Sequence, residues 1–272
     1  MIIKPTFTES FQKCNGSIDW RMKDIELLYN ENYLNYDGDR RERIPKIFHY
    51  IWVGGNPFPQ KYQELVDIWK ENHPRWEFKL WDEAAVEKFG LENYELYKRT
   101  PNPYAKTNIA RFEILNRCGG IYIDTDLLST RSIDNLLYLK FFAGYSCYMD
   151  RTTGPENVIP NIVGSCSNND MLRNIINKIK LIQNAPTTIP EIIRDGPQLF
   201  SDVLMDELDA ELTVLFPPSY FYPLNPQLLN EQYKTAIKSC KISELLNFIW
   251  KFAFMETYAI HLFYGSWQQE KS

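Results

Sequence analysis

Two acidic residues, Asp124 and Asp126, stand one residue apart at the end of the apolar run in "GGIYIDTDLLS". Like charges this close repel each other unless a cation or a ligand lies between them. Because side chains alternate faces along a strand, both carboxylates are expected on one side of an exposed strand end. Mg²⁺ and Mn²⁺ commonly bind through one or two carboxylates plus substrate phosphates. The pair therefore indicates a cation that holds a diphosphate, and a solvated turn is the simpler alternative.

The segment before this pair supplies two further polar side chains. The apolar spacing in "YAKTNIARFEILNRCGG" predicts a helix that ends at Gly119. Asn108 and Arg111 lie three residues apart and share one face of that helix. The Gly119–Gly120 turn folds the helix back, so that this face approaches the acidic pair. An amide and a guanidinium beside two carboxylates suit sugar hydroxyls and phosphate oxygens.

The elements that must position these residues follow an alternating pattern. From Ile44 onward short strands alternate with helices, which predicts a layered α/β sheet. Ligands of open α/β sheets bind beyond the carboxyl ends of strands, where the acidic pair falls. The predicted strands are 46–53, 76–81, 121–126, 141–149, 161–167 and 213–216, and the predicted helices are 59–72, 83–89 with Asp82 as N-cap, 104–118, 169–182 and 196–208.

Residues 1–43 are expected to form a helical N-terminal extension without chemistry. Within it Asp19–Tyr29 has helical periodicity, and a charged connector then leads to the first strand. Residues 44–272 are expected to form a single domain. His49 and His73 are expected to be hydrogen-bonded structural residues, the second at a helix end.

Composition narrows the class of protein. The chain has 272 residues, of which 44% are hydrophobic, so it can bury a full core. The net charge of −5 is spread along the chain, which argues against nucleic acid as a partner. The scattered cysteines lack CxxC spacing and favour buried thiols in a reducing compartment over a disulfide framework or a zinc site.

No segment reads as a signal peptide, and none approaches the roughly twenty apolar residues of a membrane span. We therefore expect a cytoplasmic protein. Lys234, Lys238 and Lys241 fall at helical spacing. They could form a peripheral contact with the inner membrane face, and a solvated helix face is the simpler alternative.

Four stretches, "IPKIFHYIWVGG", "HPRWEFKLWDE", "YAKTNIARFEILNRCGGIYIDTD" and "HLFYGSW", resemble in this order the sugar-nucleotide glycosyltransferases of family 32. That family includes yeast-type initiating mannosyltransferases, bacterial capsule and lipooligosaccharide transferases and, more distantly, the glucosylating domains of large clostridial toxins. The resemblance covers about Ile44 to Trp267. It implies a GT-A fold, which is a Rossmann-like mixed central sheet with flanking helices, over residues 44–272.

The resemblance also implies an activity. It predicts a retaining hexosyltransferase that moves a hexose from a UDP- or GDP-sugar to a hydroxyl of a glycan or lipid-linked acceptor, with Mn²⁺ or Mg²⁺ as cofactor. Trp52 matches the residue that stacks on the base, although a core position is the alternative, and Tyr122 matches one that lines the nucleotide. Arg111 matches a contact to the donor sugar, Asp124 the acid that touches ribose and sugar, and Asp126 the acid that binds the metal.

Two parts of the pattern leave alternatives open. Asn108 stands where the family usually has Asp, and an amide can bind a hydroxyl but brings no charge. Ser266 and Trp267 match the C-terminal pair that closes over the diphosphate. His261, just before them, is either a further metal ligand that would favour Mn²⁺ or a hydrogen-bonded histidine of an aromatic tail.

Two other functions share parts of this pattern. A phosphatase of the haloacid-dehalogenase type also has DxD after an apolar strand, but it places that strand early and follows it with small residues. Here "LLST" follows the pair, and much of the chain precedes it. A catalytically silent protein that binds sugar nucleotides or glycans is the second rival, and Asn108 is the feature that favours it.

Overall fold

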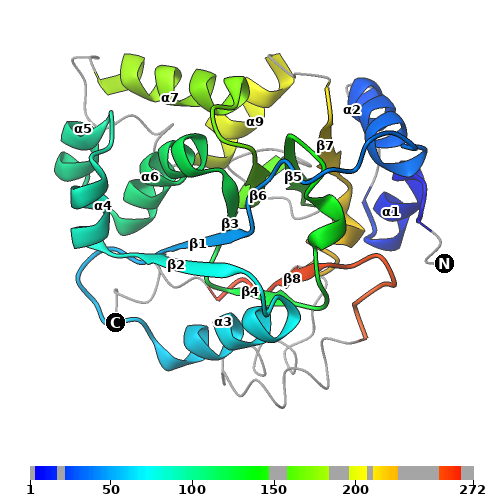
Figure 1. The fold of residues 1–272 in the computed structure, drawn as a ribbon, viewed down its shortest axis with the longest axis horizontal. Helices are drawn as coiled ribbons and strands as arrows, with labels where there is room; N and C mark the ends of the chain where they lie inside the picture. The colour runs from blue at the N-terminus through cyan, green and yellow to red at the C-terminus, as the bar shows by residue number, and fades with distance from the viewer. Residues whose placement is uncertain are drawn as a thin grey trace.

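The central sheet determines where the predicted site lies. The computed structural model describes residues 4–16, 22–146, 158–183, 196–206, 211–225 and 251–264. A six-stranded sheet has the order β2-β1-β3-β6-β5-β7 (Figure 1), in which β3 and β5 each pair antiparallel with β6 and the other neighbours are parallel. The strands are β1 (Ile47–Ile51), β2 (Glu77–Trp81), β3 (Gly120–Ile123), β5 (Phe141–Tyr145), β6 (Val158–Ser165) and β7 (Thr213–Phe216).

Helices flank this sheet, and the prediction of an α/β fold with a mixed central sheet is confirmed. In Figure 1 α6, α7 and α9 lie above the sheet, and α3 lies below it. In the part of the chain that the structure describes, no helix has the length and apolar character that crossing a bilayer requires. The flanking helices are α3 (Gln60–Asn72), α4 (Glu83–Phe89), α5 (Tyr94–Arg99), α6 (Pro103–Cys118), α7 (Asp170–Gln183) and α9 (Gly196–Asp206).

Local signals explain how α6 delivers the chain to β3. Asn102 caps the helix by accepting from the Tyr104 N–H at 2.8 Å, and Pro103 occupies its first turn. Gly119 ends the helix with a φ of 64°, but its ψ of −167° is extended rather than left-handed helical, so the chain enters β3 at once. A Cβ at Gly120 would lie 2.6 Å from the Ile47 carbonyl oxygen, so only glycine lets β3 approach β1 this closely.

The strand that carries the acidic pair is shorter than predicted. β3 ends at Ile123, where the Asp124 N–H donates to the Asn161 carbonyl at 2.8 Å. The Leu127 N–H then donates back to the Asp124 carbonyl at 3.2 Å, which closes a turn. The prediction of a strand through Asp126 is therefore wrong, because this turn redirects the chain into β4 (Leu127–Ser129).

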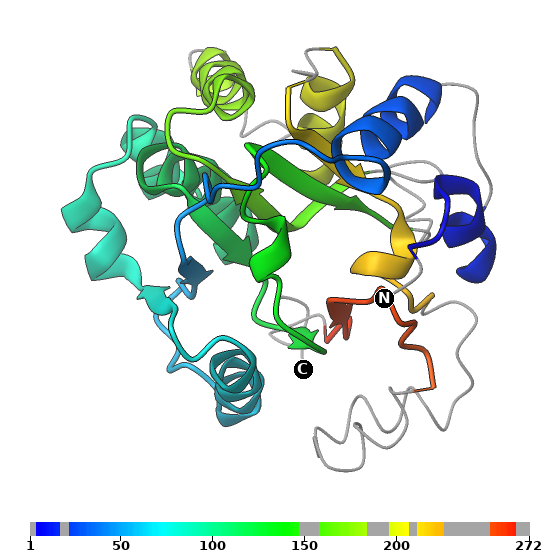
Figure 2. The same cartoon turned by 45° about the vertical axis from the view of Figure 1, so that its right-hand side comes forward.

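A small second sheet lies outside the central one and was not predicted. β4 pairs antiparallel with β8 (Ala259–His261), and Leu127 is opposite His261. Figure 2 shows this pair below the central sheet, beside α3. The pairing brings the C-terminal part of the described chain next to the acidic pair.

The N-terminal residues pack into the main core. Helices α1 (Phe7–Lys13) and α2 (Lys23–Tyr29), followed by a π-helical turn at Asn30–Leu34, bury aromatic side chains against the sheet. The Phe7 and Tyr29 side chains are completely buried. A domain boundary at residue 43 stays a prediction, and the described residues on its N-terminal side share one core with the sheet.

Two histidines are structural, as predicted. His49 Nε2 lies 2.8 Å from the Gly119 carbonyl oxygen, and Trp81 Nε1 donates to His49 Nδ1 at 3.1 Å. His73 ends α3, with Nδ1 2.8 Å from the Trp69 carbonyl and Nε2 accepting from the Ile133 N–H. Burial lowers the pKa of His49 to about 4, so the ring is neutral in the folded protein at neutral pH.

His49 should make the protein sensitive to acid. Its pKa is lower in the folded chain than in the unfolded one, so its contribution is complete above pH 6.5 and is lost as pH falls toward 4. This loss amounts to roughly 3 kcal/mol of unfolding free energy. We expect His49→Gln to be less stable at pH 7 but to lose less stability between pH 6.5 and 4.5. Urea unfolding across that pH range measures the unfolding free energy of both proteins. An equal loss of stability in the two would contradict the prediction.

Candidate active site

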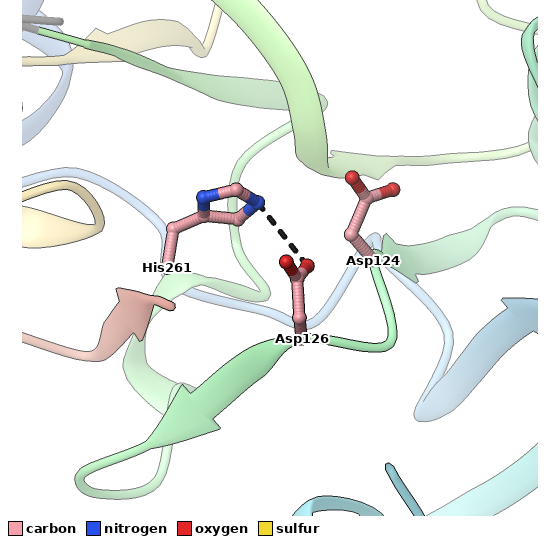
Figure 3. A group of neighbouring side chains, drawn as sticks. All are labelled: Asp124, Asp126 and His261. Carbon is pink, nitrogen blue, oxygen red and sulfur yellow. Dashed lines mark ion pairs between the residues drawn. The ribbon is translucent and has the colours of Figure 1, made fainter. Parts of the chain in front are cut away.

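Three side chains with metal-ligating atoms converge beyond the end of β3. Asp124 and Asp126 come from the β3–β4 turn, and His261 comes from β8. One ligand atom from each residue lies within 4.8 Å of the others. Figure 3 shows the two carboxylates and the imidazole directed toward a common region. The turn, rather than strand alternation, therefore brings the two acids together.

Both carboxylate oxygens of Asp126 have a partner in the C-terminal part of the described chain. Oδ1 lies 3.2 Å from His261 Nε2, and Oδ2 accepts from the Tyr264 N–H at 3.0 Å. Phe263 stands between His261 and Tyr264 in the sequence. Its φ of 54° is a left-handed conformation, which is uncommon for a non-glycine residue. Asp126 is only 8% exposed, so the expectation of an exposed strand end is wrong, because the segment after β8 covers the carboxylate.

The two acids have opposite electrostatic surroundings. Burial raises the pKa of Asp124, and the Asp126 charge adds to this while the Arg111 guanidinium opposes it. For Asp126 burial acts in the same direction, but His261 and the Tyr264 N–H outweigh it and lower the pKa. Burial alone would lower the pKa of His261, and the Asp126 carboxylate raises it instead. The Asp126 carboxylate therefore favours the protonated form of His261.

Arg111 lies beside Asp124, as the sequence predicts, and Tyr122 contacts both residues. The fully buried Arg111 donates from Nη1 to the Pro160 carbonyl at 2.6 Å, and the same atom is 3.7 Å from Asp124 Oδ1. Its guanidinium lies 4.5 Å from the centre of the Tyr122 ring, and the Tyr122 hydroxyl donates to Asp124 Oδ1. Asn108 is buried on the same helix, three residues before Arg111. These contacts fix the guanidinium next to the acid.

Trp52 stands just after β1 and is partly buried. Its Nε1 donates to the Asn56 carbonyl at 2.8 Å, and its ring packs against Phe58 and Tyr62. The Tyr62 ring in turn packs against Tyr264, whose N–H binds Asp126. Trp52 is thus linked to the site through aromatic packing, and its contact to a base stays a prediction.

The remaining predicted residues cannot be placed. Ser266 and Trp267 lie outside the described residues, as do Lys234, Lys238 and Lys241.

Sequence reasoning missed Asn161. Its Nδ2 lies 2.9 Å from His261 Nε2, and its carbonyl accepts from the Asp124 N–H at 2.8 Å. It therefore links the strand β6 to both sides of the site. The available signal was a single amide within the apolar strand "VIPNIVGS", where a polar residue needs a partner.

Part of this chain resembles known proteins. Residues 59–142 match the family model of the glycosyltransferase sugar-binding region containing the DXD motif. Inositol phosphoceramide mannosyltransferase 3 of Schizosaccharomyces pombe is 26% identical over 160 residues, which cover 57% of this chain and 43% of the relative. An uncharacterized glycosyltransferase of Acanthamoeba polyphaga mimivirus is 24% identical over 233 residues, 82% of this chain and 84% of the relative.

Among solved structures, the PaToxG glycosyltransferase aligns with a TM-score of 0.47 and 18% identity, covering 87% of this chain and 88% of that one. The alignments span less than half the length of the Schizosaccharomyces pombe mannosyltransferases that the chain matches. The matched region includes Arg111, Tyr122 and both acids of the pair. This chain therefore carries a glycosyltransferase sugar-binding region with its DXD motif at Asp124 and Asp126, and the resemblance found in the sequence motifs is confirmed.

Proposed function

We propose that this protein transfers a hexose from a nucleotide diphosphate sugar to an acceptor hydroxyl, with a divalent cation and with retention of anomeric configuration. The observation that supports it best is the convergence of Asp124, Asp126 and His261 beside Arg111, where both acids and Arg111 lie in the part of the chain that matches the DXD family model. Several relatives are named inositol phosphoceramide mannosyltransferases, so mannose is the first hexose to test. The acceptor in this proposal is a glycan or a lipid-linked oligosaccharide.

The donor set fits a divalent cation. Asp126 and His261 would hold it, with Asp124 next to them, and two carboxylates with one imidazole suit Mn²⁺ better than Mg²⁺. When bound, such an ion supplies positive charge that stabilises a leaving diphosphate. The Tyr264 N–H keeps Asp126 oriented in the absence of the ion.

Arg111 is the residue best arranged to orient the donor sugar. Its guanidinium is held by Pro160 and by the Tyr122 ring, so little entropy is lost when it binds hydroxyl or phosphate oxygens. The Asp124 carboxylate can accept a hydroxyl hydrogen, and Asn108 adds a neutral amide on the helix of Arg111.

The proposed transfer breaks the bond between the anomeric carbon and the diphosphate. The acceptor hydroxyl forms the new glycosidic bond on the face from which the diphosphate leaves. A phosphate oxygen of the leaving group takes the hydroxyl proton, so no carboxylate is required as a nucleophile. Trp52 would stack on the base, and Ser266 and Trp267 would close over the diphosphate.

Hydrolysis of the donor in the absence of an acceptor tests the proposal. The chain is incubated with GDP-mannose, UDP-glucose and related sugars in the presence of Mn²⁺, and release of the nucleoside diphosphate is measured. We expect slow release from one donor, and none in excess chelator. A haloacid-dehalogenase-like phosphatase would instead release phosphate from phosphate monoesters. A silent binding protein would bind a donor without cleaving it.

Nucleotide binding should depend on the cation. Two carboxylates repel a diphosphate, whereas a bound cation attracts it, and ligand binding to the folded state raises the melting temperature. We expect UDP or GDP to raise the melting temperature only when Mn²⁺ or Mg²⁺ is present. Thermal melting with and without chelator measures this, and equal stabilisation in both would count against a cation-bridged diphosphate.

A further inference from the structure

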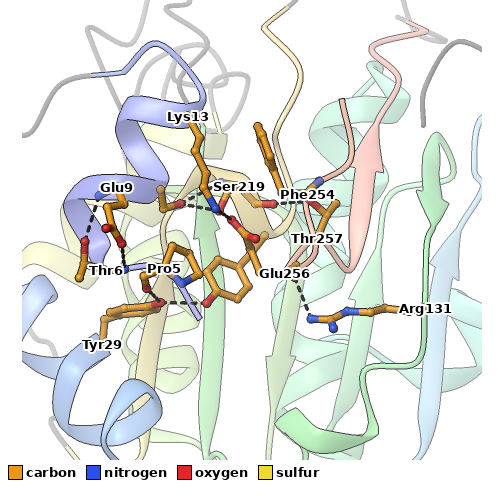
Figure 4. Close-up of polar contacts among 12 residues, drawn as sticks. Pro5, Thr6, Glu9, Lys13, Tyr29, Arg131, Ser219, Phe254, Glu256 and Thr257 are labelled. Atoms are coloured by element: carbon orange, nitrogen blue, oxygen red, sulfur yellow. Dashed lines mark hydrogen bonds and ion pairs between the residues drawn. The ribbon is translucent and has the colours of Figure 1, made fainter. Parts of the chain in front are cut away.

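Glu256 is a buried carboxylate outside the candidate metal site, in the segment 251–258 that leads into β8. It is 2% exposed, and its Oε1 lies 2.8 Å from Nζ of Lys13 on α1, whose side chain is 37% exposed. Arg131 donates from Nη2 to the Glu256 backbone carbonyl at 2.9 Å. Figure 4 shows Lys13 extending from α1 to this carboxylate. Because a buried carboxylate is costly without a cation, the conformation of this segment depends on Lys13.

The next residue of the segment is tied to α1 through a second route. The Thr257 hydroxyl donates to the Ser219 carbonyl at 2.7 Å and accepts from the Phe254 N–H. Ser219 in turn binds Ser10 of α1, with 2.7 Å between the hydroxyl oxygens and with its N–H donating to Ser10. Thr130, next to β4, donates to the Thr257 carbonyl at 2.6 Å.

Tyr258 completes the connection to the N-terminal helices. Its N–H donates to the Tyr220 carbonyl at 2.8 Å, and its hydroxyl oxygen lies 3.3 Å from that of Tyr33. The Tyr220 hydroxyl lies 2.8 Å from the hydroxyl of Tyr29, which also donates to the Pro5 carbonyl. Three consecutive residues before β8 are thus held, directly or through one neighbour, by residues of the N-terminal region.

We infer that the N-terminal helices position His261 for the cation, with the Lys13–Glu256 ion pair as the main contact. β8 is only three residues long, and the strand it pairs with in the described chain is β4. The segment before β8 therefore adds to the contacts with β4, Asp126 and Asn161 that hold His261. This inference rests on the proposed function, since it assumes a cation at Asp126 and His261. It makes Lys13 a positioning residue, remote from the substrate.

Mn²⁺ affinity of the full chain, measured by calorimetry, tests the inference. We expect Lys13→Met to weaken Mn²⁺ binding about tenfold, because the uncompensated Glu256 displaces the segment before β8. Lys13→Arg, which keeps the charge, should restore affinity to within about twofold of the original chain. The matched control is Lys178→Met, because Lys178 is 35% exposed but pairs with the exposed Asp206. It should leave Mn²⁺ affinity unchanged.

The double variant separates positioning from loss of stability. Lys13→Met combined with Glu256→Gln leaves no buried charge, so Mn²⁺ affinity should be closer to that of the original chain than in Lys13→Met alone. If Lys13→Met does not fold, Tyr33→Phe serves instead, since it removes one hydroxyl and no charge. We expect it to weaken Mn²⁺ binding about threefold.

Unchanged Mn²⁺ affinity in folded Lys13→Met, or in Tyr33→Phe where that variant is used, overturns the inference. A lower melting temperature without a change in affinity does the same, because it shows a purely structural role. An original chain that binds no Mn²⁺ contradicts the proposed function itself, which distinguishes the two failures.

Discussion

Asp126→Asn is expected to abolish donor turnover while the protein stays folded. Asn keeps the volume and one oxygen that can accept from the Tyr264 N–H, but it carries no charge to hold a cation or to pair with His261. We expect turnover to fall on the order of 10³-fold, as when an electrostatic contact of the transition state is lost. Nucleoside diphosphate release, measured at saturating donor and Mn²⁺, gives this number.

A charge change elsewhere provides the control. Asp67→Asn removes an exposed carboxylate on α3 that pairs with Lys70, and it should leave turnover unchanged. Circular dichroism and melting should show that Asp126→Asn is folded, with a loss of about 1–3 kcal/mol from the weakened contacts. Near-normal turnover in Asp126→Asn would require another residue to hold the cation.

His261→Ala is expected to weaken Mn²⁺ binding by more than about a hundredfold. Losing a residue that only orients a metal ligand costs about 10–100-fold, and losing a ligand itself costs more. His261 Nε2 already lies 3.2 Å from Asp126 Oδ1, so the imidazole needs little movement to share a cation with the carboxylate. Calorimetric titration with Mn²⁺ measures the change, and an unchanged affinity would remove His261 from the site.

His261→Ala should also change how the stability of the metal-free protein depends on pH. Asp126 raises the pKa of His261 above its ordinary value of 6.5, so the ion pair stabilises the fold fully below pH 6.5. That stabilisation is lost as pH rises through the raised pKa. Because the pKa of Asp126 is lowered, this carboxylate stays ionised and stabilises the fold until the solution is strongly acidic. The difference in unfolding free energy between the original chain and His261→Ala should therefore shrink between pH 6 and 8.5.

Most of the central fold could be predicted from the sequence because its signals are local. Pro59, Asp82 and Gly119 mark helix ends by backbone geometry and capping, and the structure has α3, α4 and α6 at these positions. The strand end at Ile123 could not be predicted, because the turn after it leads into β4, whose partner is the distant strand β8.

The candidate site was predictable only in part. Arg111, Tyr122 and Asp124 meet because a helix, a glycine turn and a strand follow one another within a short stretch of sequence. The contact between Asp126 and Tyr264 joins residues 138 positions apart, and no local pattern indicates that pairing. The covered state of Asp126 follows from this distant contact, so it was missed.

The pairing of β4 with β8 has a consequence for how the protein is made. Contacts between residues so far apart in sequence require long loops to close, and such contacts form late in folding. The turn that carries Asp126 emerges from the ribosome long before β8, the strand that carries His261. A growing chain that has reached only the central sheet would expose two acids without their histidine. The three residues would therefore come together as one cluster only near the end of folding.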